Sequence, residues 1–258
     1  MSTPFVLVER SGPIARVTLD RPERRNPLSL QMMREATAAI RALGEDPSCG
    51  VVVVTGSGPA LSAGHEIGEM IDRTLEQERE VFETCVEFME SIQAIRQPVI
   101  AEVQGHAIAA GCQLVATCDL AVTVDSARFG TPGVRIGLFC STPMVAVSRS
   151  IGRKRALQML LTGETIDAAT AVEWGLVNEA VPAQELRARV DELATRIADA
   201  SPLTLEIGKQ AFYRQIDLPQ DEAYREMAET MATNAVTCDA QEGMSAFLDK
   251  RTPHWRGE

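Results

Sequence analysis

Short apolar runs alternate with amphipathic stretches through the first half of this chain, and this alternation constrains the fold more than any other feature. Residues 51–54 are all valine and end at a Thr-Gly pair, as expected of a strand buried on both faces. Residues 98–103 indicate another short strand, whereas residues 71–95 and 109–117 follow helical spacing. The pattern predicts an α/β fold in which helices cover a largely parallel sheet.

The flanking regions have other patterns. Residues 5–8 and 14–19 indicate two short strands joined by a turn, and Ser29 can cap the helix that follows. After about residue 142 the strand patterns nearly stop, so we expect a helical subdomain in the last third of the chain. The predicted helices cover about 142–150, 153–161, 167–173, 183–200, 203–214, 218–236 and 240–250.

Composition argues against several functions. The formal net charge of −11 disfavours nucleic acid as a partner. No apolar run approaches the roughly 20 residues that span a bilayer, so we expect no membrane insertion. Residues 1–6 lack a basic stretch leading into an apolar one, and we expect no signal peptide. The six cysteines lack zinc-type spacing, which indicates reduced thiols, no metal site and a cytoplasmic location.

Two loops of small residues are candidates for a functional site. Residues 61–70 and 104–113 each follow a predicted strand and open a predicted helix. Backbone N–H groups in such turns lack intrahelical partners, so two adjacent helix N-termini can converge on one oxygen. That geometry suits a developing oxyanion. Small residues at these turns are also common packing choices, and the residues alone leave both interpretations open.

A series of ordered motifs spans nearly the whole chain. They are Arg21-Pro22 with Asn26-Pro27-Leu28, Ser62 to Glu66, Gly105 to Cys112, Cys118 to Ala121, Phe129 to Pro132, Leu161 to Glu164, Ala171 to Val177, and Glu242-Gly243 with Ala246 to Arg251. Together they resemble the crotonase (enoyl-CoA hydratase/isomerase) superfamily, most of all the subgroup represented by enoyl-CoA hydratase domain-containing protein 3. The resemblance implies a ClpP/crotonase-like fold of repeated ββα units, with a core at 1–195 and a C-terminal helical trimerisation subdomain at 196–258.

The resemblance also implies a ligand and an assembly. The superfamily binds acyl-coenzyme A thioesters and holds the thioester oxygen with two backbone N–H groups. By position these groups fall on His65 and Ala110, and Ala63 and Gly64 lie on the same loop as the first. Coenzyme A enters as part of the substrate, so no cofactor and no metal are implied. We expect a homotrimer or a dimer of trimers, because C-terminal helices of the family complete a neighbour's pocket.

The chain departs from the family where protons are transferred. Hydratases of the family hold a water between two glutamates, and these positions fall on Gln113 and Gly133. A glutamine cannot take up a proton and a glycine has no side chain. General acid–base catalysis contributes about 10²–10⁴-fold, so we expect hydration by this route to be severely reduced.

Three other side chains are candidates for chemistry. His65 lies on the first loop and can exchange a proton near neutral pH, although its ring can equally serve as packing. Cys140 and Ser141 lie on a loop that faces the acyl group in this family. Cys140 can act either as a nucleophile or as a small apolar residue that lines the pocket, and Ser141 can form a polar contact with the ligand.

Basic residues in this acidic chain fit the phosphates of coenzyme A. Arg24, Arg25 and Asn26 share one loop, which borders the adenosine part of the coenzyme in the family. Phe247 and Lys250 fall where family members reach the coenzyme of a neighbouring subunit. Without the resemblance, the two arginines are ordinary surface charges.

Two functions of different classes follow. The first is an enzyme of the enoyl-CoA hydratase/isomerase type, that is, a lyase or isomerase of fatty acid metabolism with an unusual proton relay. The second is a non-catalytic acyl-CoA binding or carrier protein. The loss of both glutamates favours the carrier. The retained polar groups at His65, Gln113 and Ser141 favour the enzyme.

Overall fold

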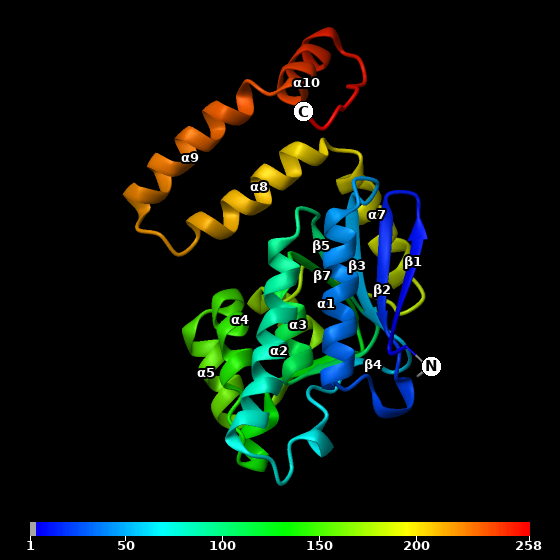
Figure 1. Cartoon of the computed structure of the whole chain (residues 1–258), viewed down its shortest axis with the longest axis vertical. Coiled ribbons are helices and arrows are strands. Elements are labelled where there is room, and N and C mark those ends of the chain that lie inside the picture. The colour runs from blue at the N-terminus through cyan, green and yellow to red at the C-terminus, as the bar shows by residue number, and fades with distance from the viewer. Residues whose placement is uncertain (1–3) are drawn as a thin grey trace.

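The computed structural model describes residues 4–258 and contains the predicted parallel sheet (Figure 1). Six strands lie in the order β1-β2-β3-β5-β7-β10, and β1 is the strand that pairs antiparallel. Their bounds are β1 Val6–Ser11, β2 Ile14–Leu19, β3 Val51–Gly56, β5 Val99–Val103, β7 Leu120–Val124 and β10 Glu179–Val181. Every residue of β3 and β5 is buried, which explains why most of their residues are apolar. Glu102 of β5 is an exception, and it pairs with the buried Arg16 at 2.9 Å.

Helices cover the sheet on both faces. Helices α1 (Leu30–Glu45) and α2 (Leu75–Ala94) lie side by side in front of it in Figure 1, and α7 (Leu186–Ala198) lies behind it. The Ser29 side chain accepts a hydrogen bond from Met32 N at 3.2 Å, so the predicted cap of α1 is confirmed. Thr74 and Gln77 form a capping box that starts α2, so residues 71–74 lie outside the helix predicted there.

A second, smaller sheet was not predicted as a separate layer. Its strands lie in the order β4-β6-β8-β9, with bounds β4 Ala60–Ser62, β6 His106–Ile108, β8 Arg128–Gly130 and β9 Thr165–Asp167. Each strand has three residues, too few for an alternating pattern to be recognised in the sequence. The 3-10 helices η1 (Pro22–Arg24), η2 (Ile67–Glu69) and η3 (Pro132–Ile136) lie on connecting loops.

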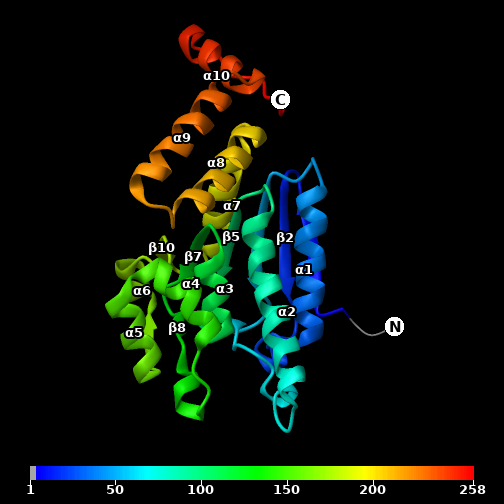
Figure 2. The same ribbon diagram turned by 60° about the vertical axis from the view of Figure 1, so that its left-hand side comes forward.

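The predicted helices after residue 142 are present. They are α4 Ser141–Ile151, α5 Arg153–Thr162, α6 Ala168–Trp174, α8 Pro202–Gln215, α9 Gln220–Ala235 and α10 Cys238–Asp249, together with α7. Helices α8, α9 and α10 extend away from the sheets, and we call them the C-terminal arm (Figures 1 and 2). The boundary expected after residue 195 falls within α7, and a division into two domains remains a prediction.

The arm is joined to the core by a buried ion pair. Lys209 of α8 donates from Nζ to Asp119 Oδ2, Ile92 O and Gln97 O, each at 2.8 Å. The Tyr213 hydroxyl donates to Asp119 Oδ1 at 2.6 Å. Burial lowers the pKa of Lys209, and the Asp119 carboxylate opposes this change.

No helix within residues 4–258 combines the length and the apolar character needed to cross a bilayer. The expectation of no signal peptide concerns in part residues 1–3, which lie outside the described residues.

Candidate active site

The small sheet brings the two predicted loops together. Strands β4 and β6 pair in parallel, so the loops that follow them leave from the same edge. A Cβ atom on Gly111 would collide with Ser62 O, which shows how closely α3 (Ala110–Thr117) packs on β4. A Cβ atom on Gly64 would lie 2.9 Å from Ala109 Cβ and 3.5 Å from Ala110 N. Glycines at 64 and 111 therefore allow the first loop to touch the start of α3.

Two backbone N–H groups at this contact lack partners. Neither His65 N nor Ala110 N has a hydrogen-bond acceptor among residues 4–258. Ala109, just before α3, has a φ of 50°, which is unusual for a residue other than glycine and is typically found at functional sites. The Ala109 N–H donates to Gly130 O at 2.8 Å, which fixes the turn that orients the Ala110 amide.

The prediction that both loops open a helix is wrong for the first. The short 3-10 helix η2 follows His65, and α2 begins only at Leu75. The acidic residues of this loop make long-range contacts, one of them to the N-terminus of α1. Glu66 pairs with Arg24 at 3.0 Å, and Glu69 accepts a hydrogen bond from Leu30 N at 2.9 Å. Of the two predicted loops, only the second therefore places the positive N-terminal end of an α-helix dipole, that of α3, at the site.

A cavity of about 670 Å³ opens beside the two amides. Its walls come from the first loop, α2, the start of α3 and the segment 132–143. Among the predicted site residues, Ala63, His65, Ala110, Gly133, Cys140 and Ser141 line it. The other lining side chains are mostly apolar, and Phe82, Leu138 and Phe139 among them were not predicted. Phe82 lies within a long helix whose inward face could not be located before the packing was known.

His65 contributes a buried ring to this cavity. Its Nδ1 lies 3.4 Å from Leu28 O, which favours the tautomer with the proton on Nδ1, and its ring meets Phe82 edge-on with centroids 5.5 Å apart. Burial lowers the pKa of His65, so the ring is neutral at pH 7. Its Nε2 is sealed from water and has no partner within residues 4–258. Proton exchange with a ligand would therefore require the ring to turn.

Gln113 lies one helical turn beyond Ala110, and its side chain is 4% exposed. Its Oε1 is 3.9 Å from Cys85 Sγ of α2, and burial raises the pKa of Cys85 to about 12. Gln113 is not among the residues that line the cavity. The amide thus packs against a thiol that stays protonated at neutral pH.

Gly133 and Cys140 occupy the opposite wall. Both are buried, and a Cβ atom on Gly133 would collide with Leu138 O and lie 2.8 Å from Cys140 Sγ. Burial raises the pKa of the Cys140 thiol, which therefore stays neutral and is a weak nucleophile. Ser141 begins α4, is exposed, and donates from Oγ to Phe139 O at 3.4 Å.

The loop that carries Arg24, Arg25 and Asn26 lies against the first predicted loop, residues 61–70. Ala63 N donates to Arg25 O at 2.9 Å, and both Arg24 and Arg25 have exposed side chains. Asn26 is fully buried, and its amide nitrogen donates to Ser57 O and Ala60 O at 2.8 Å each. The Asn26 side chain is thus occupied in holding the loop. Arg24 is paired with Glu66, whereas Arg25 forms no ion pair among residues 4–258 and is the more available group for a phosphate.

Phe247 and Lys250 lie at the end of α10, far from the cavity of their own chain (Figure 2). Phe247 is 83% exposed. A single chain therefore does not bring these two residues to the site.

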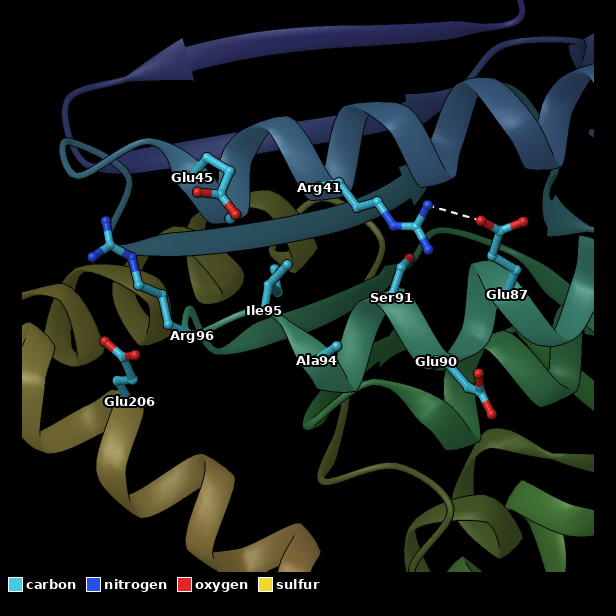
Figure 3. Close-up of a pocket in the computed structure, with 10 residues that line it drawn as sticks. Arg41, Glu45, Glu87, Glu90, Ser91, Ala94, Ile95, Arg96 and Glu206 are labelled. Atoms are coloured by element: carbon cyan, nitrogen blue, oxygen red, sulfur yellow. Dashed lines mark hydrogen bonds and ion pairs between the residues drawn. The ribbon is translucent and has the colours of Figure 1, made fainter.

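A second cavity of similar volume lies between α1, α2 and α8 (Figure 3). Its lining is charged, and Arg41 pairs with Glu87 across it at 2.7 Å. None of the predicted site residues lies there. Within residues 4–258, no group of three or more His, Cys, Asp or Glu side chains is placed to hold a metal ion.

Known proteins with this sequence pattern and fold share one family. Residues 9–258 match the family model described as enoyl-CoA hydratase/isomerase. The chain is 42% identical to the mitochondrial enoyl-CoA hydratase domain-containing protein 3 of Xenopus laevis over 254 residues, 98% of this chain and 86% of that protein. A solved enoyl-CoA hydratase of Mycobacterium smegmatis is 43% identical, with a TM-score of 0.96 and coverage of 98% and 99% of the two chains.

Human enoyl-CoA hydratase domain-containing protein 3 is similar in structure as well. Its crystal structure has a TM-score of 0.95 and 40% identity, and the match covers 97% of this chain and all of that one. The expected cytoplasmic location is contradicted by the vertebrate relatives, which are named as mitochondrial proteins. The predicted fold and subgroup resemblance are confirmed, and the chain belongs to the enoyl-CoA hydratase/isomerase family of the crotonase superfamily.

Proposed function

We propose that this chain binds an acyl-CoA thioester and holds the thioester oxygen between the N–H groups of His65 and Ala110. One observation carries the proposal: two unpartnered amides lie together at the wall of a largely apolar cavity. Preorganised donors of this kind stabilise an enolate-like oxygen, and one donor can contribute about 2.7–4 kcal/mol to catalysis. The apolar wall suits the acyl chain of such a ligand.

The surroundings support binding of coenzyme A without a separate cofactor. Arg24 and Arg25 lie on the loop that touches Ala63, so phosphates of the coenzyme can pair with them next to the thioester site. Phe247 and Lys250 reach a cavity only in an assembly, which supports a homotrimer or a dimer of trimers in which they serve a neighbouring subunit.

We do not propose that the protein hydrates its ligand with a pair of carboxylates. Gln113 faces a neutral thiol, and a side chain at Gly133 would have no room. If the protein is an enzyme, it acts on the enolate as an isomerase or lyase of fatty acid metabolism, and His65 supplies the proton exchange after its ring turns. The second candidate is a non-catalytic acyl-CoA carrier, favoured by the buried, unpartnered Nε2 of His65.

A proline substitution tests the paired amides directly. Ala110→Pro removes the N–H at the first position of α3, where proline is tolerated in helices, and Ala110→Gly keeps it. We expect calorimetry with octanoyl-CoA to show about 2–10-fold weaker binding for the proline variant than for the glycine variant. Equal affinities, with both variants folded by circular dichroism, would contradict the oxyanion role.

A second assay separates the enzyme from the carrier. The enone absorbance of crotonyl-CoA and decenoyl-CoA is followed over time with the same protein. A loss of absorbance that disappears in His65→Gln supports an enzyme with an unusual relay. Binding with an unchanged absorbance supports the carrier or a reaction other than hydration.

A further inference from the structure

Residues 251–258 follow α10 and run back along it towards the start of α8 (Figure 1), and we call them the return segment. Glu242 of α10 holds the first part of this segment. Its carboxylate accepts a bidentate pair from the Arg251 guanidinium at 2.6 and 2.9 Å, and the His254 N–H donates to it at 2.9 Å. The hydrogen bonds from Arg251 and His254 lower the pKa of Glu242 to about 2, so the carboxylate stays ionised at neutral pH.

Asp239, one turn before Glu242 on α10, holds the second part of the return segment. Its side chain is buried, and it accepts hydrogen bonds from Arg256 N at 2.7 Å and from Gly257 N at 3.1 Å. The Ser201 hydroxyl, which caps α8, donates to the same carboxylate at 2.6 Å. One carboxylate therefore joins the start of α10, the return segment and the start of α8.

These contacts fix α10, which has little else to hold it in a single chain. Apart from Asp239, the buried residue of α10 is Ala246, and no residue of α9 is buried. The Trp255 ring adds a further contact, since it lies over Gly243 and its Nε1 donates to Asp199 O at the end of α7 at 2.8 Å. The position of α10 therefore depends on the return segment.

Lys250 lies at the turn between α10 and the return segment. Its φ is 55°, a left-handed conformation that residues other than glycine adopt rarely, and usually where the surrounding structure imposes it. Arg251 imposes it here, because its N–H donates to Ala246 O at 3.0 Å while its guanidinium pairs with Glu242. The Lys250 side chain is exposed and forms no ion pair among residues 4–258.

We propose that Glu242 is a positioning residue: through Arg251 it fixes the turn at Lys250 and so presents that ammonium group to the phosphates of a coenzyme bound by a neighbouring subunit. This inference rests on the proposed function, because it requires an acyl-CoA ligand and an assembly. A lysine on a mobile turn would have to be ordered when the phosphate binds, whereas here the backbone is ordered in advance. Loss of the pair should weaken binding of the coenzyme about 2- to 10-fold.

Two thioesters test the inference on the intact protein. Octanoyl-pantetheine carries the same thioester as octanoyl-CoA but lacks the adenosine and its phosphates. By calorimetry, Glu242→Ala should weaken octanoyl-CoA binding about 2- to 10-fold and leave octanoyl-pantetheine binding unchanged. Arg251→Lys keeps the charge but cannot form the bidentate pair, so it should act in the same direction. If Glu242→Ala does not fold, Arg251→Lys decides.

The matched control is Glu229→Ala. Glu229 is an exposed carboxylate of α9 that forms no ion pair within the described residues and does not touch the return segment. Its removal changes the charge of the arm by the same amount as Glu242→Ala and should leave both affinities unchanged. A loss of octanoyl-CoA affinity equal to that of Glu242→Ala would overturn the inference, because the effect would then come from charge alone.

A double-mutant cycle distinguishes positioning from a general structural effect. In a Lys250→Ala background, Glu242→Ala should weaken octanoyl-CoA binding no further, because the group that it positions is gone. An undiminished effect in that background would overturn the inference. Light scattering should give the same mass for every variant. A smaller assembly for Glu242→Ala would mean that the return segment acts on the subunit interface, and it too would overturn the inference.

The remaining outcomes separate this inference from the proposed function. If the wild type binds neither thioester, the proposed function is wrong. If Lys250→Ala weakens octanoyl-CoA binding but Glu242→Ala and Arg251→Lys do not, the inference is wrong and the proposed function stands. If Lys250→Ala leaves octanoyl-CoA binding unchanged, Lys250 does not meet the coenzyme, so the inference is wrong while acyl-CoA binding stands.

Discussion

At the scale of single residues, Gly133 supplies no carboxylate, and the atoms around it leave no room for a side chain. The backbone oxygen of Leu138 and the thiol of Cys140 fill the space around it. Any side chain must therefore displace backbone, which is harder than turning a flexible side chain. Adding a carboxylate at this position would disturb the cavity wall before it could act on a water molecule.

Substitutions at Gly133 test this enclosure. Gly133→Ala should lower the free energy of unfolding by about 1–3 kcal/mol, because the added Cβ forces the loop to shift. Urea denaturation measures this change. Gly208→Ala is the control: this residue lies inside α8 with nothing near its Cβ position, and the change should raise stability by about 0.5–1 kcal/mol. Gly133→Glu should leave hydration of crotonyl-CoA no faster than in the wild type.

His65 should make stability depend on pH. Burial lowers its pKa in the folded state, so between that value and the ordinary histidine pKa of about 6.5 the unfolded chain binds more protons. Stability contributed by the neutral ring is therefore present above pH 6.5 and is lost as the pH falls through this window. Urea denaturation at about pH 7.5 and pH 5.5 should show a smaller loss for His65→Gln than for the wild type. Equal losses would indicate that the ring titrates normally.

At the scale of elements, α8 is attached to the core by buried polar groups. The Lys209–Asp119 pair joins it to the ends of α2, β5 and β7, since Asp119 Oδ2 also accepts a hydrogen bond from Val99 N at 2.7 Å. Removing one member leaves an uncompensated buried charge, which costs far more than losing a surface pair.

We expect Lys209→Ala to lower the free energy of unfolding by about 3–5 kcal/mol. Arg225→Ala is the matched control, because its pair with Asp221 is largely exposed, and its effect should be below about 1 kcal/mol. Urea denaturation of both variants provides the comparison. A loss for Lys209→Ala as small as that of the control would mean that α8 is held by other contacts.

At the scale of the whole molecule, the C-terminal arm presents many apolar side chains to solvent. The exposed ones include Phe212, Ile216, Tyr224, Met231, Val236, Phe247 and Leu248. Such a concentration of exposed apolar surface is typical of protein interfaces. It supports the predicted trimer and offers a reason why the arm extends from the core instead of folding back on it.

Light scattering at micromolar concentration should show a homotrimer or a dimer of trimers. Phe247→Glu should shift the protein towards smaller species, because a charge would be buried at the interface. Leu7→Glu is a control at an exposed apolar residue of β1, outside the arm, and should leave the mass unchanged. A monomeric wild type would contradict the predicted assembly.

The sequence by itself determined the fold class, the helical C-terminal third and the family. These properties depend on local periodicity and on ordered motifs, which are written directly in the order of residues. The same information predicts the amides of His65 and Ala110 as the oxyanion donors, because a backbone N–H is present whatever the side chain. It also predicts that Gln113 and Gly133 stand where hydratases of the family carry glutamates, since that prediction needs only the residue types at the matched positions.

Only the tertiary structure decided what surrounds these residues. The three-residue strands of the second sheet are too short to be recognised alone, yet they place the two loops at one edge. The thiol of Cys140 against Gly133 and the thiol of Cys85 against Gln113 are contacts between elements. The buried state of His65 Nε2 likewise depends on packing. Contacts of this kind depend on how distant segments pack, and no local pattern encodes that packing.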